Sequence, residues 1–403
     1  MIQKPGKIPV KYHVFLFVFL TTLMLVSNLR PYNYNFSFLI GIQKEFYELN
    51  KPYFPNKFVI LEKSGYDGQF FYLTARYLYS DLSAPVMDTF RLRFNRLGLP
   101  LLTGLLSFPT HFKLYPEITF SLLCFFHLLS FYILYNYLQE KQKLYSLFYL
   151  FSPFTINSDL LLVSDSFFAS IFILCFVPIL KMYQEKKDNS FSIFLIIILL
   201  SYFSLIRETA LFVSVPFSIY LIYTKRRKLF FYSLIPILVY ISFFAYTYFI
   251  LSQHPETNPP PSVFKLLDFP FLGLLKSLSM DLSSNPKIIV KQLSKLPIPI
   301  YFILLIFNIY NITSIQRFIL FLPLLAIIGL AAISEKDYWD SFDNISRMFT
   351  LTGPIIILFK NKMENYKDFY VLHAGALIYL LVLIRFIAIK QGMTFFLSNI
   401  HLH

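Results

Sequence analysis

Cysteine is nearly absent from this sequence. Only Cys124 and Cys175 occur in 403 residues, and both lie inside apolar runs. Such cysteines behave as small buried apolar residues, so we expect neither a disulfide nor a cysteine metal pair. Charged residues are also scarce, at 14%, whereas hydrophobic residues make up 56%. A soluble core could not bury that much apolar surface, which excludes an ordinary soluble protein.

Nucleic-acid-binding motifs are missing as well, although the formal net charge is +14. No zinc-finger or RNA-recognition pattern occurs, and the basic residues lie in particular connectors rather than in a basic domain, so we expect no nucleic-acid partner. No small-residue cleavage site follows the first apolar run, 13–29, which we interpret as an uncleaved anchor. No internal repeat is visible, which disfavours transporters built from two inverted halves.

Apolar runs separated by short polar connectors fill most of the chain. A spanning helix needs about 20 apolar residues, and many runs reach or approach that length. We therefore predict an all-α membrane protein, a single membrane domain over 1–403 with about eleven transmembrane helices. The predicted spans are 13–29, 115–138, 144–162, 165–181, 190–206, 208–224, 229–251, 297–311, 315–333, 346–360 and 369–390.

The apolar segment 97–108 is too short to span, and we interpret it as an interfacial or half-inserted helix. We expect the protein to lie in the cell (inner) membrane with its N-terminus in the cytoplasm. This choice then puts most basic connectors on the cytoplasmic side, as the positive-inside rule requires. If 97–108 spanned, every later connector would change sides. The basic residues placed inside are Lys141, Lys143, Lys181, Lys186, Lys187, those at 225–228, Arg317, Lys360, Lys362 and Lys367.

Two long loops then lie on the extracytoplasmic side, 30–114 and 252–296. Long loops of this kind usually carry function. The second begins with a proline-rich stretch before a predicted amphipathic segment around 263–278.

Ionisable residues from distant parts of the sequence share this predicted outer level. Charged groups at a membrane are costly and usually have a purpose. We expect Asp67, Arg207 and Arg347 to line one outward cavity. The full set also includes Asp159, Asp165, Glu208, Asp340 and Asp343.

The most informative stretch is Tyr-Asp-Gly-Gln-Phe-Phe-Tyr at 66–72. Asp-Gly is a common turn dipeptide, so Asp67 could serve only as a turn or helix-cap residue. The aromatic-rich stretch 70–79 predicts an interfacial helix, which would instead hold the Asp67 carboxylate at the membrane surface.

In this position the stretch resembles a hallmark of the GT-C superfamily of membrane glycosyltransferases, an acidic residue in the first extracytoplasmic loop. It is similar to the Tyr-Asp-Gly-Gln-Phe-Tyr-Tyr of some bacterial membrane proteins and, more loosely, to the Trp-Asp-Gly of GPI mannosyltransferases. The chain also distantly resembles protein O-mannosyltransferases. Arg91, Arg93, Arg96 and Pro100 resemble the arginine segment and proline-bearing helix that follow in the bacterial group. The motif covers a small part of the chain, and the hydropathy layout covers nearly all of it.

The resemblance implies an inverting transfer of one sugar from a polyprenyl-phosphate donor to an extracytoplasmic acceptor, such as a cell-envelope glycan, lipid or protein. Asp67 would be the general base for the acceptor hydroxyl. The Asp-Asp or Glu-x-Asp pair of some relatives is absent beside Asp67, so a divalent metal stays open but has no support in the sequence, and no cofactor is assigned. Phosphate binding would fall to Arg91, Arg93, Arg96, Arg207, Glu208 and Arg347, with Gln69, Tyr72, Asp159, Asp165 and Asp343 as accessory residues.

Each of these residues also has a simpler interpretation. The arginines at 91–96 could contact only lipid head groups. Arg207 and Glu208 could pair only with each other, and Asp159 could cap a helix. Arg347 is predicted to open a helix, where a cation needs an anionic partner such as phosphate.

Two other functions are compatible with the same residues. A transporter or lipid-intermediate flippase would use the charges as a translocation path, and a membrane scaffold would not use them chemically. A transporter should concentrate polar groups near the midplane, whereas these lie at one end of the predicted helices. The expected partners are the donor, the acceptor and membrane lipids.

Overall fold

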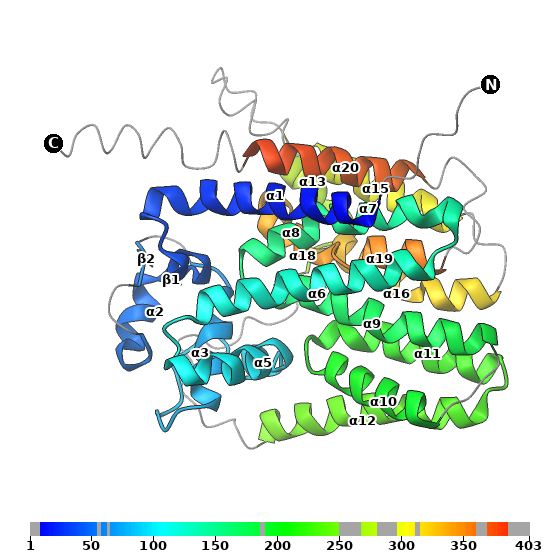
Figure 1. Ribbon diagram of the computed structural model, residues 1–403, viewed down its shortest axis with the longest axis horizontal. Coiled ribbons are helices and arrows are strands. Elements are labelled where there is room, and N and C mark those ends of the chain that lie inside the picture. Colours follow the sequence, from blue (N-terminus) through cyan, green and yellow to red (C-terminus); the bar gives the residue numbers. More distant parts are fainter. Residues whose placement is uncertain are drawn as a thin grey trace.

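The computed structural model describes residues 9–54, 58–62, 65–185, 190–249, 267–279, 296–310, 315–359 and 369–385. Helices account for nearly all of its regular structure, which confirms the all-α prediction. Most long helices lie side by side along one axis (Figure 1). These are α1 (Val10–Leu29), α6 (Tyr115–Tyr137), α9 (Ser164–Glu185), α10 (Ser190–Ser204), α11 (Leu211–Tyr223), α12 (Arg227–Phe249), α15 (Pro297–Tyr310), α16 (Ile315–Ile333) and α20 (Phe369–Ile384).

Shorter elements connect the long helices or cover their ends. The short helices are α2 (Lys44–Leu49), α3 (Gly68–Leu78), α4 (Phe90–Phe94), α5 (Gly98–Ser107), α7 (Ser146–Leu150), α8 (Pro153–Leu160), α13 (Leu272–Leu278), α17 (Lys336–Asp340), α18 (Phe342–Met348) and α19 (Thr352–Phe359). Segments of 3-10 helix occupy Arg30–Tyr32, Phe36–Ile40, Lys51–Tyr53, Phe108–Thr110, Glu140–Tyr145 and Glu208–Ala210. The strands β1 (Ile42–Gln43) and β2 (Ile60–Leu61) are each two residues long and pair in parallel.

The long helices have the length and composition of membrane spans. In the described part of the chain four are long and apolar enough to cross a bilayer: α1, α6, α9 and α12. The shorter apolar helices α10, α11, α15, α16 and α20 accompany them. Apolar side chains also cover outer surfaces of the bundle, and on α12 Phe231, Leu238 and Ile241 are more than half exposed. A surface of this kind is stable in lipid rather than in water, so the chain is a membrane protein.

Two of the predicted spans are wrong as single helices. Segment 144–162 is divided into α7 and α8, because Pro153 lacks an N–H and begins a new helix that Ser152 caps by accepting from the Thr155 N–H. Segment 346–360 is likewise divided between α18 and α19. Both breaks lie within packed protein, since α8 contacts α9 and α18 while α19 contacts α9 and α16. Irregular backbone at membrane depth is tolerated only in such surroundings.

The first predicted loop, 30–114, is folded and covers one end of the bundle, on the left of Figure 1. It holds α2 to α5 and both strands. The apolar segment at 97–108 forms the ten-residue helix α5, and the aromatic stretch at 70–79 lies largely in α3, as predicted. Most of the second loop, 252–296, lies outside the described residues, and α13 falls within its predicted amphipathic segment.

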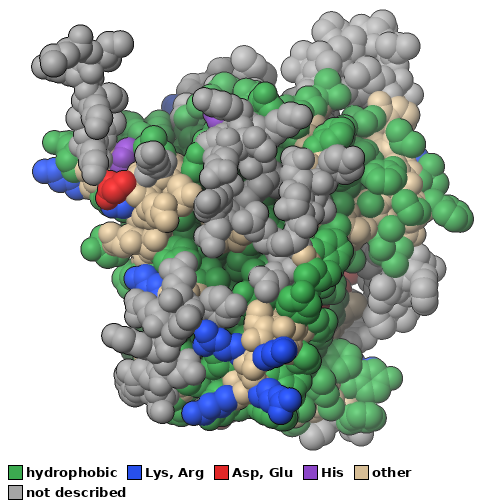
Figure 2. Space-filling view, turned by 90° about the vertical axis from the view of Figure 1, so that its right-hand side faces the viewer, with side chains coloured by type: hydrophobic (Ala, Val, Ile, Leu, Met, Phe, Trp, Pro, Cys, Tyr) green, Lys and Arg blue, Asp and Glu red, His purple; other side chains and the backbone are tan. Residues whose placement is uncertain are grey.

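Basic residues collect at the other end of the bundle. The α9 C-terminus and the α11–α12 connector lie on the right of Figure 1, and they carry Lys181 and the basic residues at 225–228. Figure 2 looks onto this end and shows Lys and Arg side chains gathered over its lower part. Among the described residues, Lys181 and the basic residues at 225–228, which the sequence prediction placed on one side of the membrane, thus lie at the same end of the bundle.

Gly98 joins the folded loop to α10 at a close contact. The Gly98 N–H donates to the Leu205 carbonyl at 2.8 Å, and the Gly98 carbonyl accepts from the Tyr202 hydroxyl at 2.6 Å. A Cβ atom at this position would lie 2.6 Å from Ile206 Cγ1 and 3.0 Å from Ile206 Cα. A residue larger than glycine would therefore push α5 away from the connector that follows α10.

We expect Gly98→Ala to lower the thermal unfolding midpoint in detergent, with a loss of about 1–3 kcal/mol from overpacking. The matched control is Gly329→Ala in α16, where an added Cβ meets nothing within 4 Å. Because alanine favours helix over glycine, this control should leave stability unchanged or raise it by up to about 1 kcal/mol. Equal effects of the two substitutions would contradict the close contact at Gly98.

Candidate active site

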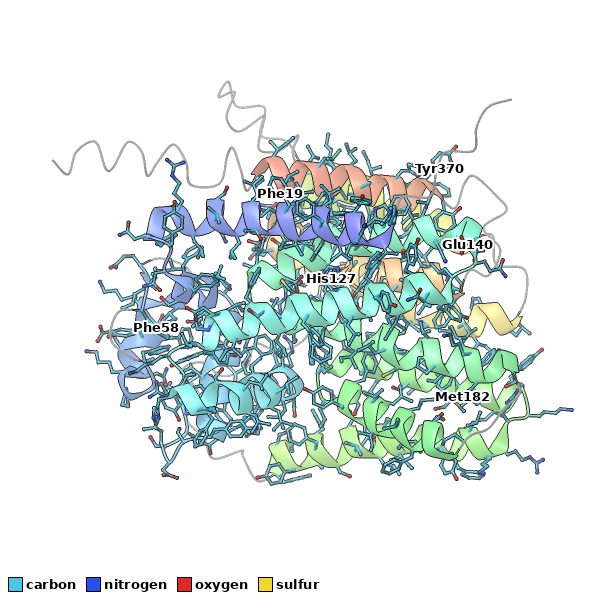
Figure 3. All side chains as sticks on the ribbon, viewed as in Figure 1. Phe19, Phe58, His127, Glu140, Met182 and Tyr370 are labelled. Carbon is cyan, nitrogen blue, oxygen red and sulfur yellow. The ribbon has the colours of Figure 1, made fainter. Side chains whose placement is uncertain are left out.

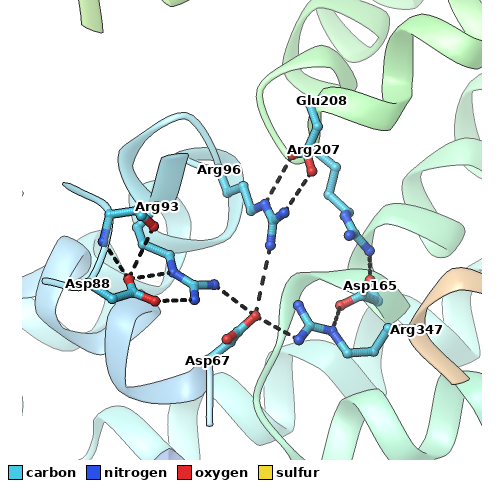
Figure 4. Close-up of polar contacts among 9 residues, drawn as sticks. Asp67, Asp88, Arg93, Arg96, Asp165, Arg207, Glu208 and Arg347 are labelled. Atoms are coloured by element: carbon cyan, nitrogen blue, oxygen red, sulfur yellow. Dashed lines mark hydrogen bonds and ion pairs between the residues drawn. The ribbon is translucent and has the colours of Figure 1, made fainter. Parts of the chain in front are cut away.

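Asp67 immediately precedes α3, but its side chain does not cap that helix. The carboxylate instead faces three arginines, with Asp67 Oδ2 at 2.6 Å from Arg347 Nη1, 3.0 Å from Arg93 Nη1 and 3.9 Å from Arg96 Nη1 (Figure 4). The interpretation of Asp67 as a cap residue is therefore wrong. Its position at the helix start aims the carboxylate at cations from two other parts of the chain.

The neighbours of Asp67 in the motif hold it in place. A Cβ at Gly68 would lie 2.7 Å from the Ile40 carbonyl oxygen and 2.9 Å from that of Leu161, so only glycine fits between these two segments. Gln69 Oε1 accepts from the Gln43 N–H at 3.0 Å and so attaches α3 to β1. The buried Tyr72 hydroxyl donates to the Tyr53 carbonyl at 2.8 Å. Gln69 and Tyr72 thus support the loop, and the arginine that donates to the Tyr72 hydroxyl, at 3.1 Å, is Arg76 rather than Arg93, Arg96 or Arg347.

Arg93 is held in a fork by Asp88. Its Nε donates to Asp88 Oδ1 at 3.0 Å and its Nη2 to Oδ2 at 2.7 Å, which leaves Nη1 for Asp67. Its guanidinium also lies over the Phe70 ring, 4.4 Å from the centroid. Packing and pairing together fix the direction in which this arginine points.

Arg96 makes a similar fork across a longer stretch of sequence. Its Nε and Nη2 donate to the two oxygens of Glu208 at 3.0 and 2.7 Å. Arg207 pairs instead with Asp165. Arg207 and Glu208 both lie in the connector between α10 and α11. They form ion pairs with other residues, so the interpretation that they pair only with each other is wrong.

Asp165, in the first turn of α9, is completely buried and lies between two arginines. Arg207 pairs with its Oδ1, and Arg347 Nε donates to its Oδ2 at 2.9 Å. Arg347 thereby bridges Asp165 and Asp67. It lies in the last turn of α18, not at a helix start as predicted, and a cation is favourable there.

Asp67, Arg207 and Arg347 thus come together through ion pairs, as expected, whereas the outward cavity that they were expected to line stays a prediction. In the part of the chain that the structure describes, four arginines and four carboxylates make up this cluster, so its formal charges balance. The arginine side chains are between 11% and 16% exposed, which leaves their edges within reach of a ligand. The members of this arginine cluster are Asp67, Asp88, Arg93, Arg96, Asp165, Arg207, Glu208 and Arg347.

Electrostatics keep Asp67 ionised. Burial raises the pKa of its carboxyl, but Arg347, Arg93 and Arg96 outweigh burial and hold that pKa well below its usual range. Burial alone would lower the pKa of Arg93, but the negative charges of Asp67 and Asp88 raise that pKa by more than burial lowers it. Asp67 is therefore a carboxylate at neutral pH, in the proton-accepting form.

Other predicted site residues lie outside the cluster. Arg91 points away and its guanidinium lies 5.2 Å from the centroid of the Tyr248 ring. Asp343 accepts from Asn157 Nδ2 at 3.1 Å and lies 3.8 Å from Arg385. Asp159 lies inside α8 rather than at a cap, and its Oδ2 is 3.0 Å from His127 Nδ1.

Two residues that matter here are missing from the sequence prediction. Asp88 orients Arg93, yet an aspartate five residues before an arginine has no distinctive signal. His127 projects from the middle of α6 into the bundle and is completely buried (Figure 3). A histidine inside an apolar run of spanning length is unusual, because an ionisable group is costly in lipid. This pattern in the sequence could have identified His127.

Asp165→Asn should destabilise the protein by about 3–5 kcal/mol, because it leaves Arg207 and Arg347 buried with too little negative charge. Thermal unfolding in detergent would measure the loss. Glu62→Gln is the matched control, since Glu62 pairs with Lys44 on an exposed surface. Its effect should stay within about 0.5 kcal/mol, and an equally mild effect of Asp165→Asn would contradict the role of the buried pair.

The contribution of Asp67 to stability should depend on pH. Its folded-state pKa lies below the unfolded value of about 3.9, so its ionisation stabilises the fold above that pH, and the benefit is lost as the pH falls. We expect the difference in unfolding midpoint between wild type and Asp67→Asn to be largest near pH 7 and to shrink from about pH 5 to pH 3. A difference that stayed constant over this range would show that the arginines do not act through the Asp67 charge.

No known protein family, curated protein or solved structure matches this chain. Its function therefore has to be inferred from the arginine cluster and its place at the end of a membrane bundle.

Proposed function

We propose that this protein is a GT-C-type glycosyltransferase that moves a sugar from a polyprenyl-phosphate donor to an extracytoplasmic acceptor. One observation carries the proposal. The ionised Asp67 lies among three arginines from two other segments of the chain, at one end of a bundle with helices of membrane length. The cluster thus offers a proton acceptor and a phosphate-binding surface at the level where a lipid phosphate resides.

The arginines are suited to the donor phosphate. A guanidinium binds phosphate oxygens through two parallel N–H groups, and Arg93, Arg96 and Arg347 converge within 4 Å of a single oxygen of Asp67. Arg207 Nε has no hydrogen-bond partner among the described residues and remains a potential donor. A phosphate that enters the cluster would exchange carboxylate contacts for phosphate contacts.

Donor binding would also change the basicity of Asp67. While Arg347 and Arg93 contact it, Asp67 is ionised but a weak base, because a low pKa reduces the driving force for taking up a proton. Contacts from these arginines to a phosphate would weaken their hold on Asp67 and bring its pKa back toward the usual range. The base would then gain strength only when the donor is present.

The reaction would proceed as a single displacement. The acceptor hydroxyl oxygen forms a bond to the anomeric carbon while the bond from that carbon to the phosphate oxygen breaks, with inversion at the sugar. The hydroxyl proton passes to Asp67, and the bonding pair of the broken bond leaves with the polyprenyl phosphate. Arginines that contact the phosphate stabilise this departing charge, so no protonated acid is needed there.

Helix α5 would provide access from the lipid. It is too short to span, and Leu105 and Leu106 on its surface are 56% and 44% exposed. We place this end of the bundle on the extracytoplasmic side, with the basic end and the N-terminus in the cytoplasm. If the broken pairs α7–α8 and α18–α19 each cross once, the chain has the eleven crossings predicted from its hydropathy.

The proposal can be tested with purified protein and radiolabelled polyprenyl-phosphate sugars presented with an envelope fraction as acceptor. Asp67→Asn should lower kcat by about 10²–10⁴-fold, as expected for loss of a general base. Asp81→Asn, an exposed aspartate of the same loop, is the matched control and should retain full activity. Full activity of folded Asp67→Asn would exclude Asp67 as the base.

A second pair of variants tests phosphate binding in the same assay. Arg93→Lys keeps the charge but removes the fork, so KM for the donor should rise by at least about tenfold. Arg91→Lys changes a neighbouring arginine outside the cluster and should leave KM unchanged. Equal KM values for the two variants would contradict phosphate binding by the cluster.

One observation favours transport as a second candidate. His127 and Asp159 form a completely buried ionisable pair near the middle of α6, where a transporter would place polar groups. Sealed proteoliposomes distinguish the two functions. A transporter would move the lipid-linked sugar between leaflets without releasing polyprenyl phosphate, and this movement would be lost in His127→Leu, whereas a glycosyltransferase releases polyprenyl phosphate.

A further inference from the structure

A partly open apolar cavity lies at the end of the bundle opposite the arginine cluster. It is formed mainly by α9, α10, α11 and α12 and leaves about 680 Å³ unfilled, its open side included. The lining is almost wholly apolar and includes Leu180, Ile196, Leu200, Phe217, Leu229 and Tyr232. An apolar space of this kind does not hold ordered water, so it is suited to an apolar ligand.

A basic turn adjoins the cavity. Leu221 and Leu229, which line it, flank the connector 224–228, whose Lys225, Arg227 and Lys228 are exposed. The hairpin from 211 to 249 contains no aspartate or glutamate. Among the described residues these three side chains have no ion-pair partner. Positive charge and apolar space thus occur together at one level of the membrane.

We propose that this cavity binds an acyl chain of an anionic phospholipid, whose head-group phosphate contacts Lys225, Arg227 and Lys228. Basic pockets between helices at the cytoplasmic side are suited to such lipids, because each cation near the surface adds attraction for the anion. A zwitterionic lipid would fill the cavity equally well but gain less from the turn. A soluble phosphate could contact the three cations, but it has no apolar part to fill the cavity, so it does not fit as the occupant.

This lipid would support the arginine cluster from a distance. Helix α10 begins beside the cavity, where Ile193 and Ile196 line it, and ends at Ser204 just before Arg207 and Glu208. A filled cavity therefore holds the helix that presents two members of the cluster. The inference does not depend on the proposed sugar transfer, because lipid binding and stability can be measured without turnover.

The test uses delipidated full-length protein in a neutral detergent, titrated with phosphatidylglycerol or with phosphatidylcholine of identical acyl chains. Native mass spectrometry counts bound lipid, and thermal unfolding reports stabilisation. Phosphatidylglycerol should bind at least about tenfold more tightly and raise the midpoint more. The triple variant Lys225→Gln, Arg227→Gln, Lys228→Gln should lose this preference. Equal binding of the two lipids to wild type would overturn the proposal.

Two controls separate the site from general lipid adhesion. Removal of the same charge elsewhere, by Lys44→Gln, Lys51→Gln and Lys113→Gln, should leave the preference intact. Ile196→Phe adds bulk inside the cavity and should reduce bound phosphatidylglycerol, whereas Ile198→Phe places the same bulk on the exposed face of α10 and should not. If Ile196→Phe and Ile198→Phe bind equally, the acyl chain does not occupy the cavity.

Discussion

The buried carboxylate of Asp165 is the interaction on which the rest of the site depends. A fully buried charge is costly unless it is paired, and Asp165 is paired twice, by Arg207 and by Arg347. These partners come from the α10–α11 connector and from α18, so one carboxylate joins three parts of the bundle. Arg347 then extends the pairing to Asp67 and attaches the folded loop to the helices.

This arrangement explains how Asp67, the proposed general base, can be held in place on a loop. The segment 30–114 has few long elements of its own, yet Gly98, Gly68 and the ion pairs of Asp67 fix it against the bundle. Rigid attachment keeps a side chain within reach of a reacting atom, which a freely moving loop would not do. The glycines matter because they permit contacts that any side chain would block.

Hydropathy predicts most of the helices because burial in lipid dominates every other term for a long apolar run. It does not predict the breaks at Pro153 and before Thr352, because prolines also lie inside the continuous helices α9, α11, α12 and α16, and the breaks depend on local capping and packing. The grouping of Asp67, Arg207 and Arg347 is predictable because orientation places them at one level. Which arginine pairs with which carboxylate is not, since Asp88 and Asp165 act through side-chain geometry that no spacing encodes.

The balance of charge in the arginine cluster has a consequence for selectivity. Each guanidinium already has a carboxylate partner, so the cluster presents little net field to attract small anions from solution. Inorganic phosphate or a free nucleotide would have to displace those partners with nothing else to gain. A phosphate carried on a long hydrocarbon chain arrives with the membrane as its solvent and is concentrated at that depth. Under the proposed function, this neutrality would favour lipid-borne phosphates over soluble ones.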